Sequence, residues 1–144
     1  MSVKVKAELS DKNPYHINKF RYYELKYHCL QYPIWKKQHQ ELIDVHYGSD
    51  ILSTHSKTNV ITDKVPLCAE KRLRFRDKMQ IIEQAAIATD SELYSYILKG
   101  VTEGVSYHYL KMQLNIPCCR NTYYQLYRRF FWILDHTHNS HFLL

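Results

Sequence analysis

The sequence predicts an all-α protein. Only three glycines and four prolines occur in 144 residues, which is too few turn-forming residues for a protein built of many short strands. Apolar side chains recur three and four positions apart over long segments, the spacing of one helix face. Hydrophobic residues make up 45% of the chain and aromatic residues 14%, so a packed core is expected and intrinsic disorder is excluded.

The first predicted helix covers residues 13–31 and follows a charged segment, 1–12, that is expected to be a loose tail. Asn13 is the predicted cap, and Pro14 suits the first helical position. The expected buried face of this helix consists of Phe20, Tyr23, Tyr27 and Leu30.

A second helix is predicted from Pro33 to a stop at Gly48. Its expected buried side consists of Trp35, Leu42 and Val45. Because the break at Tyr32-Pro33 is short, the two helices are expected to form a hairpin. Residues 49–66 are rich in Ser, Thr, Asn and Asp without an apolar period, which predicts a long loop.

A third helix is predicted over residues 67–87. Its expected apolar stripe consists of Phe75, Met79, Ile82 and Ala86. A new unit is expected to start at Thr89, because Thr89 and Glu92 have the spacing of a capping box. The helix that follows carries Leu93 and Ile97 and is expected to end near Gly100.

Two helices joined by a turn complete the chain. Ser106 is the predicted cap of a short helix, and Asn115 is expected in the left-handed conformation that ends it. One face of this helix is predicted to hold Tyr107, Leu110 and Leu114. The last helix is predicted over 120–134, with a core stripe of Tyr123, Leu126, Tyr127, Phe130 and Leu134. This succession is the plan of a helix-turn-helix, although an ordinary helical hairpin shows the same pattern.

The opposite face of the last helix carries side chains that suit DNA. Asn and Gln can bridge N6 and N7 of adenine, and Arg can bridge O6 and N7 of guanine. Asn121, Gln125 and Arg128 are therefore the candidates for contacts with base edges. The predicted DNA-binding set is completed by Tyr124, Arg129 and Lys111 as phosphate contacts, and by Arg120. A net charge of +6 and a pI of about 9.1 also favour nucleic acid, with an anionic surface as the second choice.

The same segment resembles a known family. The residues that carry the resemblance are, in order, Ile116, Pro117, Arg120, Asn121, Thr122, Tyr123, Tyr124, Arg128, Arg129, Phe130 and Phe131. They are similar to the C-terminal helix-turn-helix of late-transcription regulators of the RinA and ArpU type, from phages of Gram-positive bacteria, and more broadly to the promoter-binding region of sigma factors. Cys119 stands where that group tends to have a capping serine, and a thiol is a weaker acceptor.

A weaker similarity extends to the N-terminal half. It rests on a helix that ends at Tyr32-Pro33, a second helix, a polar linker with Ser56 to Thr58, and a basic helix. The resemblance implies an all-helical activator of late phage or prophage promoters. We expect an N-terminal region, 13–88, that dimerises or contacts host RNA polymerase, and a helix-turn-helix domain, 89–136, that binds double-stranded DNA.

Two functions from other classes stay open. A small terminase-like recognition subunit for DNA packaging would also combine a helix-turn-helix with oligomerising helices. A protein-binding inhibitor would use the aromatic face as its interface and would not bind DNA.

The basic segment 70–78 holds five cations. Arg74 and Arg76 point about 200° apart around a helix, so these cations are expected to form a collar of solvated side chains. A second contact with the DNA backbone, or with an acidic patch on RNA polymerase, is the functional alternative.

Other classes find little support. Cys118 and Cys119 lack the spacing of zinc ligands, and His136, His138 and His141 lie in an expected flexible tail, so no metal or cofactor is predicted. No recognised catalytic motif occurs, so an enzyme is not expected. No apolar stretch approaches the roughly 20 residues of a membrane span, and no signal peptide is apparent. These features predict a protein of the cytoplasm of the bacterial host cell, with reduced cysteines.

Overall fold

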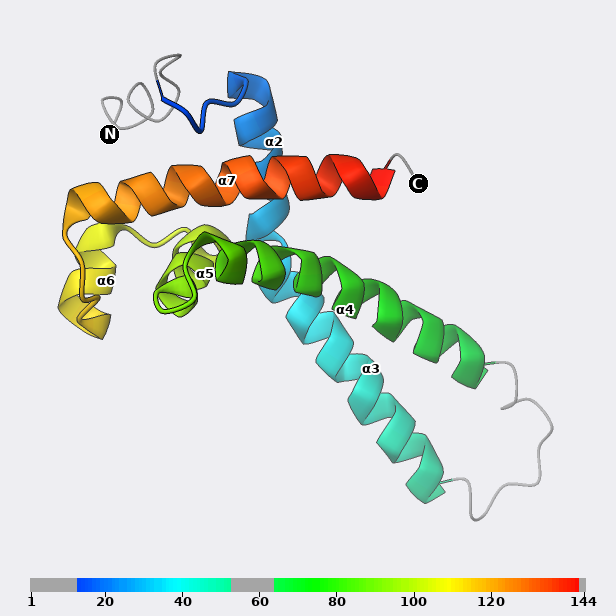
Figure 1. Cartoon of the computed structure of the whole chain (residues 1–144). Helices are drawn as coiled ribbons and strands as arrows, with labels where there is room; N and C mark the ends of the chain where they lie inside the picture. The colour runs from blue at the N-terminus through cyan, green and yellow to red at the C-terminus, as the bar shows by residue number, and fades with distance from the viewer. Residues whose placement is uncertain (1–12, 53–63, 143–144) are drawn as a thin grey trace. The chain divides into compact units, whose positions relative to one another are not determined.

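A computed structural model of the chain describes residues 13–52 and 64–142, with side chains for 13–44 and 67–137. Every regular element in these ranges is an α-helix (Figure 1), which confirms the predicted fold class. In chain order the helices are α2 (Lys19–Leu30), α3 (Tyr32–Leu52), α4 (Lys64–Thr89), α5 (Tyr94–Glu103), α6 (Tyr107–Leu114) and α7 (Arg120–Phe142). The segment 1–12, predicted as a tail, lies outside the described residues.

The helices pack as two compact units. In the described part of the chain, one unit combines residues 13–31 with the part from Ile81 onward, and the other lies within Tyr32–Gln80. This division differs from the predicted regions 13–88 and 89–136, because α2 packs against α5 and α7. The predicted hairpin of the first two helices is not confirmed, since the partners of α2 within its unit come from the C-terminal half of the chain.

The start of α2 is set by Asn18, so the cap predicted at Asn13 is wrong. The side-chain oxygen of Asn18 accepts a hydrogen bond from the Phe20 N–H at 2.9 Å and satisfies one of the free donors at the helix start. Asn13 instead closes a separate turn, in which its side chain accepts from the Tyr15 N–H at 2.9 Å.

The buried face of α2 also differs from the prediction. Phe20 and Tyr27, which were expected in the core, are 78% and 63% exposed. The buried side chains are Tyr22, Leu25 and Cys29. Tyr22 makes edge-to-face contacts with the rings of Tyr127 and Phe131, and its hydroxyl lies 3.1 Å from that of Tyr127. Long-range contacts with α7 thus decide which face of α2 is buried.

In the unit Tyr32–Gln80, both helices are longer than predicted. α3 continues through Gly48 to Leu52, and α4 begins at Lys64, so both ends of the predicted loop 49–66 are helical. The remaining residues of that loop, 53–63, lie outside the described part of the chain. Of the predicted buried side of α3, Trp35 is buried, Leu42 is half-buried, and Val45 lies outside the described side chains. The ammonium group of Lys78 on α4 lies 5.4 Å from the centre of the Trp35 ring.

α4 confirms its predicted stripe, since Met79, Ile82 and Ala86 are buried and Phe75 is half-buried. The capping box predicted at Thr89 is wrong, because α4 includes Thr89, whose hydroxyl donates to the carbonyl oxygen of Ala85 at 2.7 Å. Its neighbour Asp90 makes the cap-like bonds instead and accepts from the N–H groups of Glu92 and Leu93 at 2.9 and 2.8 Å. Both residue types are good caps, so sequence preference alone does not separate them.

α5 runs past Gly100 to Glu103 and ends at Gly104, which has a φ of 69°. Gly100 lies inside the helix because α7 comes close there: a Cβ atom at this position would fall on the Tyr123 hydroxyl group. The buried side chains of α5 and α7 include Ile97, Val101, Tyr123, Phe130, Phe131 and Leu134. Phe131 was absent from the predicted stripe of the last helix, whereas Leu126 and Tyr127, which were part of it, are only half-buried.

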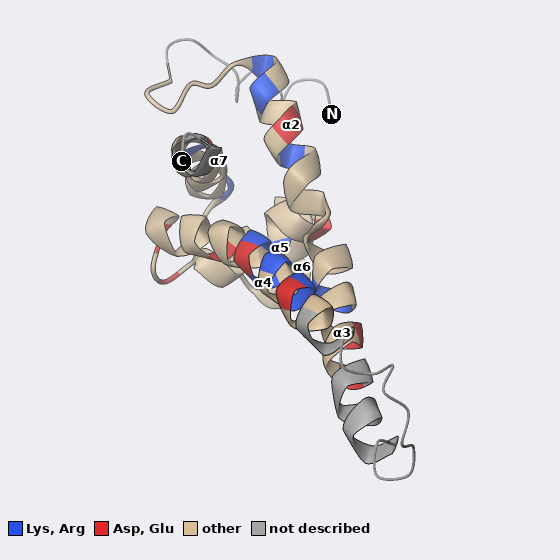
Figure 2. Ribbon diagram, turned by 90° about the vertical axis from the view of Figure 1, so that its right-hand side faces the viewer, with Lys and Arg blue, Asp and Glu red and all other residues tan. Residues whose placement is uncertain are grey.

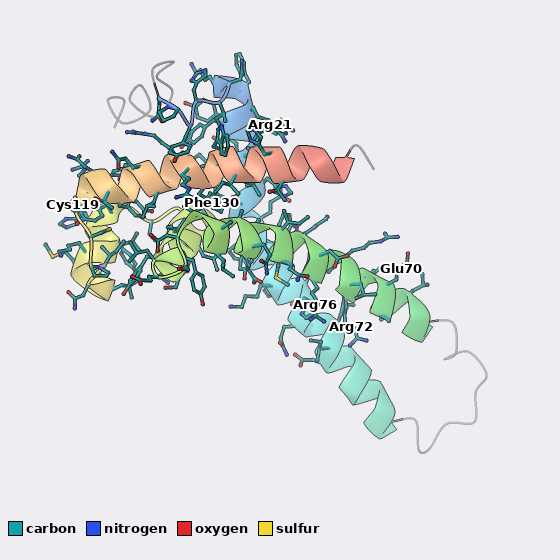
Figure 3. All side chains as sticks on the ribbon, viewed as in Figure 1. Arg21, Glu70, Arg72, Arg76, Cys119 and Phe130 are labelled. Carbon is teal, nitrogen blue, oxygen red and sulfur yellow. The ribbon has the colours of Figure 1, made fainter. Side chains whose placement is uncertain are left out.

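α7 is longer than predicted and continues from Arg120 to Phe142. The predicted end of the last helix at 134 is therefore wrong, and His136, His138 and His141 belong to α7, although the side chains of His138 and His141 lie outside the described ones. The ring nitrogen Nδ1 of His136 is 2.8 Å from the carbonyl oxygen of Trp132. Arg21 of α2 forms an ion pair with Asp135 at 2.7 Å, where α2 crosses α7 (Figure 3).

Candidate nucleic-acid interface

The short helix α6 has the ends that were predicted for it. The hydroxyl of Ser106 accepts from the Tyr109 N–H at 3.2 Å, which caps the start. Asn115 adopts the left-handed conformation at φ 51° and ψ 47°, which ends the helix. Leu110 is buried and Tyr107 half-buried as expected, but Leu114, predicted on the same face, is 39% exposed. α6 thus buries one face and leaves the rest to solvent.

The turn between α6 and α7 is held by packing and by hydrogen bonds. Ile116 is completely buried against Leu110 and Tyr123. Its N–H donates to the carbonyl oxygen of Leu110 at 3.2 Å. The hydroxyl of Tyr107 donates to the carbonyl oxygen of Cys118 at 2.7 Å. The turn is therefore tied to α6 at both of its ends, which fixes where α7 begins.

Cys119 occupies the position before the first residue of α7, as predicted, and its carbonyl oxygen accepts from the Tyr123 N–H at 3.0 Å. Its exposed sulfur lies 3.1 Å from the Thr122 hydroxyl oxygen at the corner between α6 and α7 (Figure 3). The hydrogen bond with Thr122 lowers the pKa of the Cys119 thiol. Burial raises the pKa of the neighbouring Cys118 thiol, so the two adjacent cysteines differ in acidity.

The structure separates the predicted DNA-binding residues by exposure. Exposed side chains are Arg120, Asn121 and Gln125 on α7 and Lys111 on α6. Half-buried side chains are Tyr124, Arg128 and Arg129. The Nε atom of Arg128 is buried and makes no hydrogen bond within the described part of the chain. Lys111 is near the turn, where its charge favours the Cys118 thiolate. The first turns of α7 are thus the most open part of the predicted face.

The far end of the same face is covered by the segment that precedes α2. The ring of Tyr15 contacts Trp132 edge-on at 5.7 Å between centroids. His136 contacts the same indole ring at 4.1 Å. No local pattern in the sequence indicated that Tyr15 would pack against Trp132, which lies more than a hundred positions later in the chain. This packing confines the open part of the predicted face to the start of α7.

Two exposed side chains on α6 were not predicted as site residues. Tyr109 is 41% and Met112 64% exposed, and they flank Lys111 in the sequence. Only the structure shows that both side chains are exposed. They are candidates for further surface contacts of α6.

The charge of the segment that contains α6 and the first part of α7 has one sign. Residues 104–134 contain four cations, Lys111, Arg120, Arg128 and Arg129, and no Asp or Glu. The first turns of α6 and α7 are likewise free of acidic residues. Such a segment attracts anions, and the N–H groups at the start of α7 add to that attraction. Asp90, from outside the segment, is close enough to the turn to oppose ionisation of the Cys118 thiol.

The cations of α4 have different surroundings. Figure 2 shows both signs of charge interleaved on this helix. Arg74 forms an exposed ion pair with Glu70 at 2.8 Å, and Lys78 lies over Trp35. Arg72 is half-buried, and Arg76 is exposed (Figure 3). These contacts support the reading of the basic segment as a mixed, solvated surface.

Comparison with known proteins found no match to a family model, to a characterised protein or to a solved structure. Within residues 13–52 and 64–142, no helix has the length and apolar character needed to cross a membrane. In the same part of the chain, no three His, Cys, Asp or Glu side chains gather in a way that would hold a metal ion.

Proposed function

We propose that the chain is a sequence-specific DNA-binding transcription activator, in which α6 and α7 form a helix-turn-helix and the start of α7 enters a major groove. The observation that carries the proposal is the open, wholly non-acidic start of α7. Arg120, Asn121 and Gln125 are exposed there, within a segment that holds four cations and no Asp or Glu. Recognition helices contact base edges with their N-terminal residues.

The roles within this face follow from exposure. Asn121 and Gln125 carry amide groups that can pair with adenine, and both are free of covering side chains. Lys111 and Arg129 contact phosphates on either side. Arg128, whose Nε is buried, can offer only the end of its guanidinium group, so its contribution to base recognition is smaller than that of Asn121 and Gln125.

The activator role rests on the resemblance to regulators of the RinA and ArpU type. In this proposal the promoters are those of late phage or prophage genes. The unit Tyr32–Gln80 contacts host RNA polymerase or a second copy of the chain. A second copy suits helix-turn-helix proteins, because they commonly bind two half-sites one turn of DNA apart.

One observation favours the packaging alternative as a second candidate. The unit Tyr32–Gln80 exposes Ile34, Leu67 and Leu73, each by more than half. Exposed apolar residues on paired helices suit an oligomer interface. The measured mass of the purified protein separates the two functions: a large ring of identical chains favours DNA packaging, and a monomer or dimer favours regulation.

The test of DNA binding is selection of bound fragments from the genome that carries the gene, at a stated salt concentration, because affinity depends steeply on salt. We expect a small set of fragments to be enriched. Asn121→Ala should reduce that enrichment, whereas Lys36→Ala, which removes an exposed charge from α3, should retain it. A wild-type sample that ignores all duplexes at low ionic strength would contradict the proposal.

A further inference from the structure

The first turn of α7 contains a cation–π pair. The guanidinium carbon of Arg120 lies 5.7 Å from the centre of the Tyr124 ring. The two residues are four positions apart, so they are neighbours on the helix surface. Arg120 is exposed, whereas Tyr124 is half-buried. The pair therefore joins a solvent-facing charge to a ring that is partly inside the protein.

The Tyr124 ring is itself held in place. It contacts the Tyr123 ring at 5.1 Å and 70°, and the Tyr127 ring at 6.1 Å and 69°. Tyr123 is only 1% exposed and packs with Leu110 and Ile116 under the turn. The ring of Tyr124 is thus an outward continuation of the core, and it gives Arg120 a fixed surface to lie on.

Arg120 is also poorly placed for the stability of its own helix. A cation at the first position opposes the helix dipole, and no acidic residue accompanies it in the first turn of α7. Among the described residues, Arg120 forms no ion pair. Its partner within the described part of the chain is the neutral ring of Tyr124. A cation that stands at the start of a helix without an anionic partner is characteristic of a functional position, and an electronegative group from outside would supply that partner.

We propose that Arg120 recognises a guanine, and that Tyr124 is the positioning residue that holds the plane of its guanidinium group. Two N–H groups of Arg120 would donate to O6 and N7 of one guanine in the major groove. This inference rests on the proposed DNA binding. It assigns Tyr124 a role through its ring, in place of the predicted contact between its hydroxyl and a phosphate.

The choice of a base over a phosphate follows from the ring support. A phosphate can also bind arginine in a bidentate way, but it accepts hydrogen bonds from other directions as well, so a fixed guanidinium plane is less necessary there. A guanine edge presents its two acceptors in one plane, and the rigid fork of arginine matches them only when the two planes coincide. Holding the side chain before binding also reduces the conformational entropy that is lost on binding.

The experiment begins with the duplex that wild-type protein selects from a randomised pool at fixed salt. Affinities are then measured for that duplex and for each single base-pair change, with wild type and three variants. Arg120→Lys keeps the charge and loses the planar fork. Tyr124→Phe keeps the ring and loses the hydroxyl. Tyr124→Leu loses the ring, and its thermal unfolding is recorded to confirm that the fold is kept.

We expect wild type to favour guanine at one position by about 10-fold or more, the discrimination of a good bidentate contact. Arg120→Lys should lose the preference at that position and keep those elsewhere. Tyr124→Phe should behave as wild type, and Tyr124→Leu should lose most of the same preference. Should Tyr124→Leu fail to fold, Arg120→Lys still decides the guanine contact, and Tyr124→Phe decides whether the Tyr124 hydroxyl takes part.

Other outcomes overturn the inference. Equal weakening of all sequences by Arg120→Lys would make Arg120 a phosphate contact, and weakening by Tyr124→Phe would make the hydroxyl the functional group. In both cases the protein would still select a sequence, so DNA recognition would stand while the guanine assignment failed. If wild type selects no sequence at all, the proposed function fails together with the inference.

Discussion

Two segments of this chain are rich in cations, and they differ in what surrounds those cations. Residues 70–78 hold five cations together with Glu70 and Asp77, and Arg74 is already paired with Glu70. Residues 104–134 hold four cations and no acidic residue. The first segment has more cations, but its two acidic residues leave it with a lower net positive charge than the second segment. The second is the better candidate for an anionic partner.

The comparison teaches that a count of lysines and arginines is a poor guide to a nucleic-acid interface. Mixed charges on one face make short-range pairs that are worth little and are screened by salt. A segment of single sign keeps its field until a partner neutralises it. The rigidity of the backbone matters as well, because base recognition needs side chains at fixed positions. The turn before α7 is held by Ile116 and by the Tyr107 hydroxyl.

The first prediction, which has the largest effect, tests how tightly the turn before α7 is packed. Ile116→Ala should lower the free energy of unfolding by about 2–5 kcal/mol, because it leaves a cavity under the turn. Ile34→Ala on α3 should change it by less than about 0.5 kcal/mol, since Ile34 is 56% exposed and Ile116 is completely buried. Denaturant unfolding measures both. Equal losses in the two variants would show that the turn is no better packed than the surface of α3.

A second experiment contrasts the two segments in DNA binding. Asn121→Ala should reduce the affinity for the selected site by about 1–3 kcal/mol and leave affinity for unrelated DNA unchanged, because a bidentate base contact is lost. Arg74→Ala in the other segment should have no effect on either. Competition titrations with both duplexes make the measurement. A loss for Arg74→Ala that matched the loss for Asn121→Ala would place the basic helix in the interface.

The dependence of affinity on salt concentration also distinguishes the cations of the two segments. Lys111→Ala should weaken binding to all sequences alike and lower the slope of log affinity against log salt by about one. Arg76→Ala, which removes an exposed cation of α4, should leave the slope unchanged. Titrations at several salt concentrations give the slopes. Identical slopes for wild type and Lys111→Ala would remove Lys111 from the phosphate contacts.

The smallest expected effect concerns the cap of α7. Cys119→Ser should raise the melting temperature by on the order of 2 °C, because a hydroxyl accepts a hydrogen bond better than a thiol. The hydrogen bond with Thr122 lowers the pKa of the folded thiol below its usual value. The folded state then binds fewer protons, so the wild type gains stability as pH rises through this pKa, and the advantage of serine narrows. Melting curves from neutral to alkaline pH measure the difference in melting temperature between Cys119→Ser and wild type. A difference that widened as pH rose would contradict this prediction.

Local signals in the sequence predicted local structure correctly. Ser106, Asn115 and the start of α7 at Arg120 were predicted because caps and left-handed positions depend on a few neighbouring residues. The predicted cap at Thr89 was wrong because Thr89 and Asp90 are adjacent and both are good caps. Burial of Thr89 inside α4 decided between them, and Asp90 makes the cap-like hydrogen bonds.

Contacts between distant segments could not be predicted. Tyr22, Leu25 and Cys29 have the same helical spacing as the residues predicted to be buried, and only packing on α7 selects between the two faces. The candidate site shows the same limit. The exposure of Asn121 and Gln125 followed from the period of α7, whereas the burial of Arg128 Nε and the cover of Tyr15 over Trp132 depend on the tertiary structure.

The place of α2 in its unit has a consequence for synthesis on the ribosome. α2 is translated early, but it packs against α5 and α7, which come much later in the chain. Roughly 60 residues separate the end of α2 from the start of α5, so at about 5–20 residues per second its apolar face waits several seconds for its first partner. Tyr22, Leu25 and Cys29 stay accessible to chaperones during that interval. The unit that contains α2, α5 and α7 can therefore close only after α7 has been synthesised.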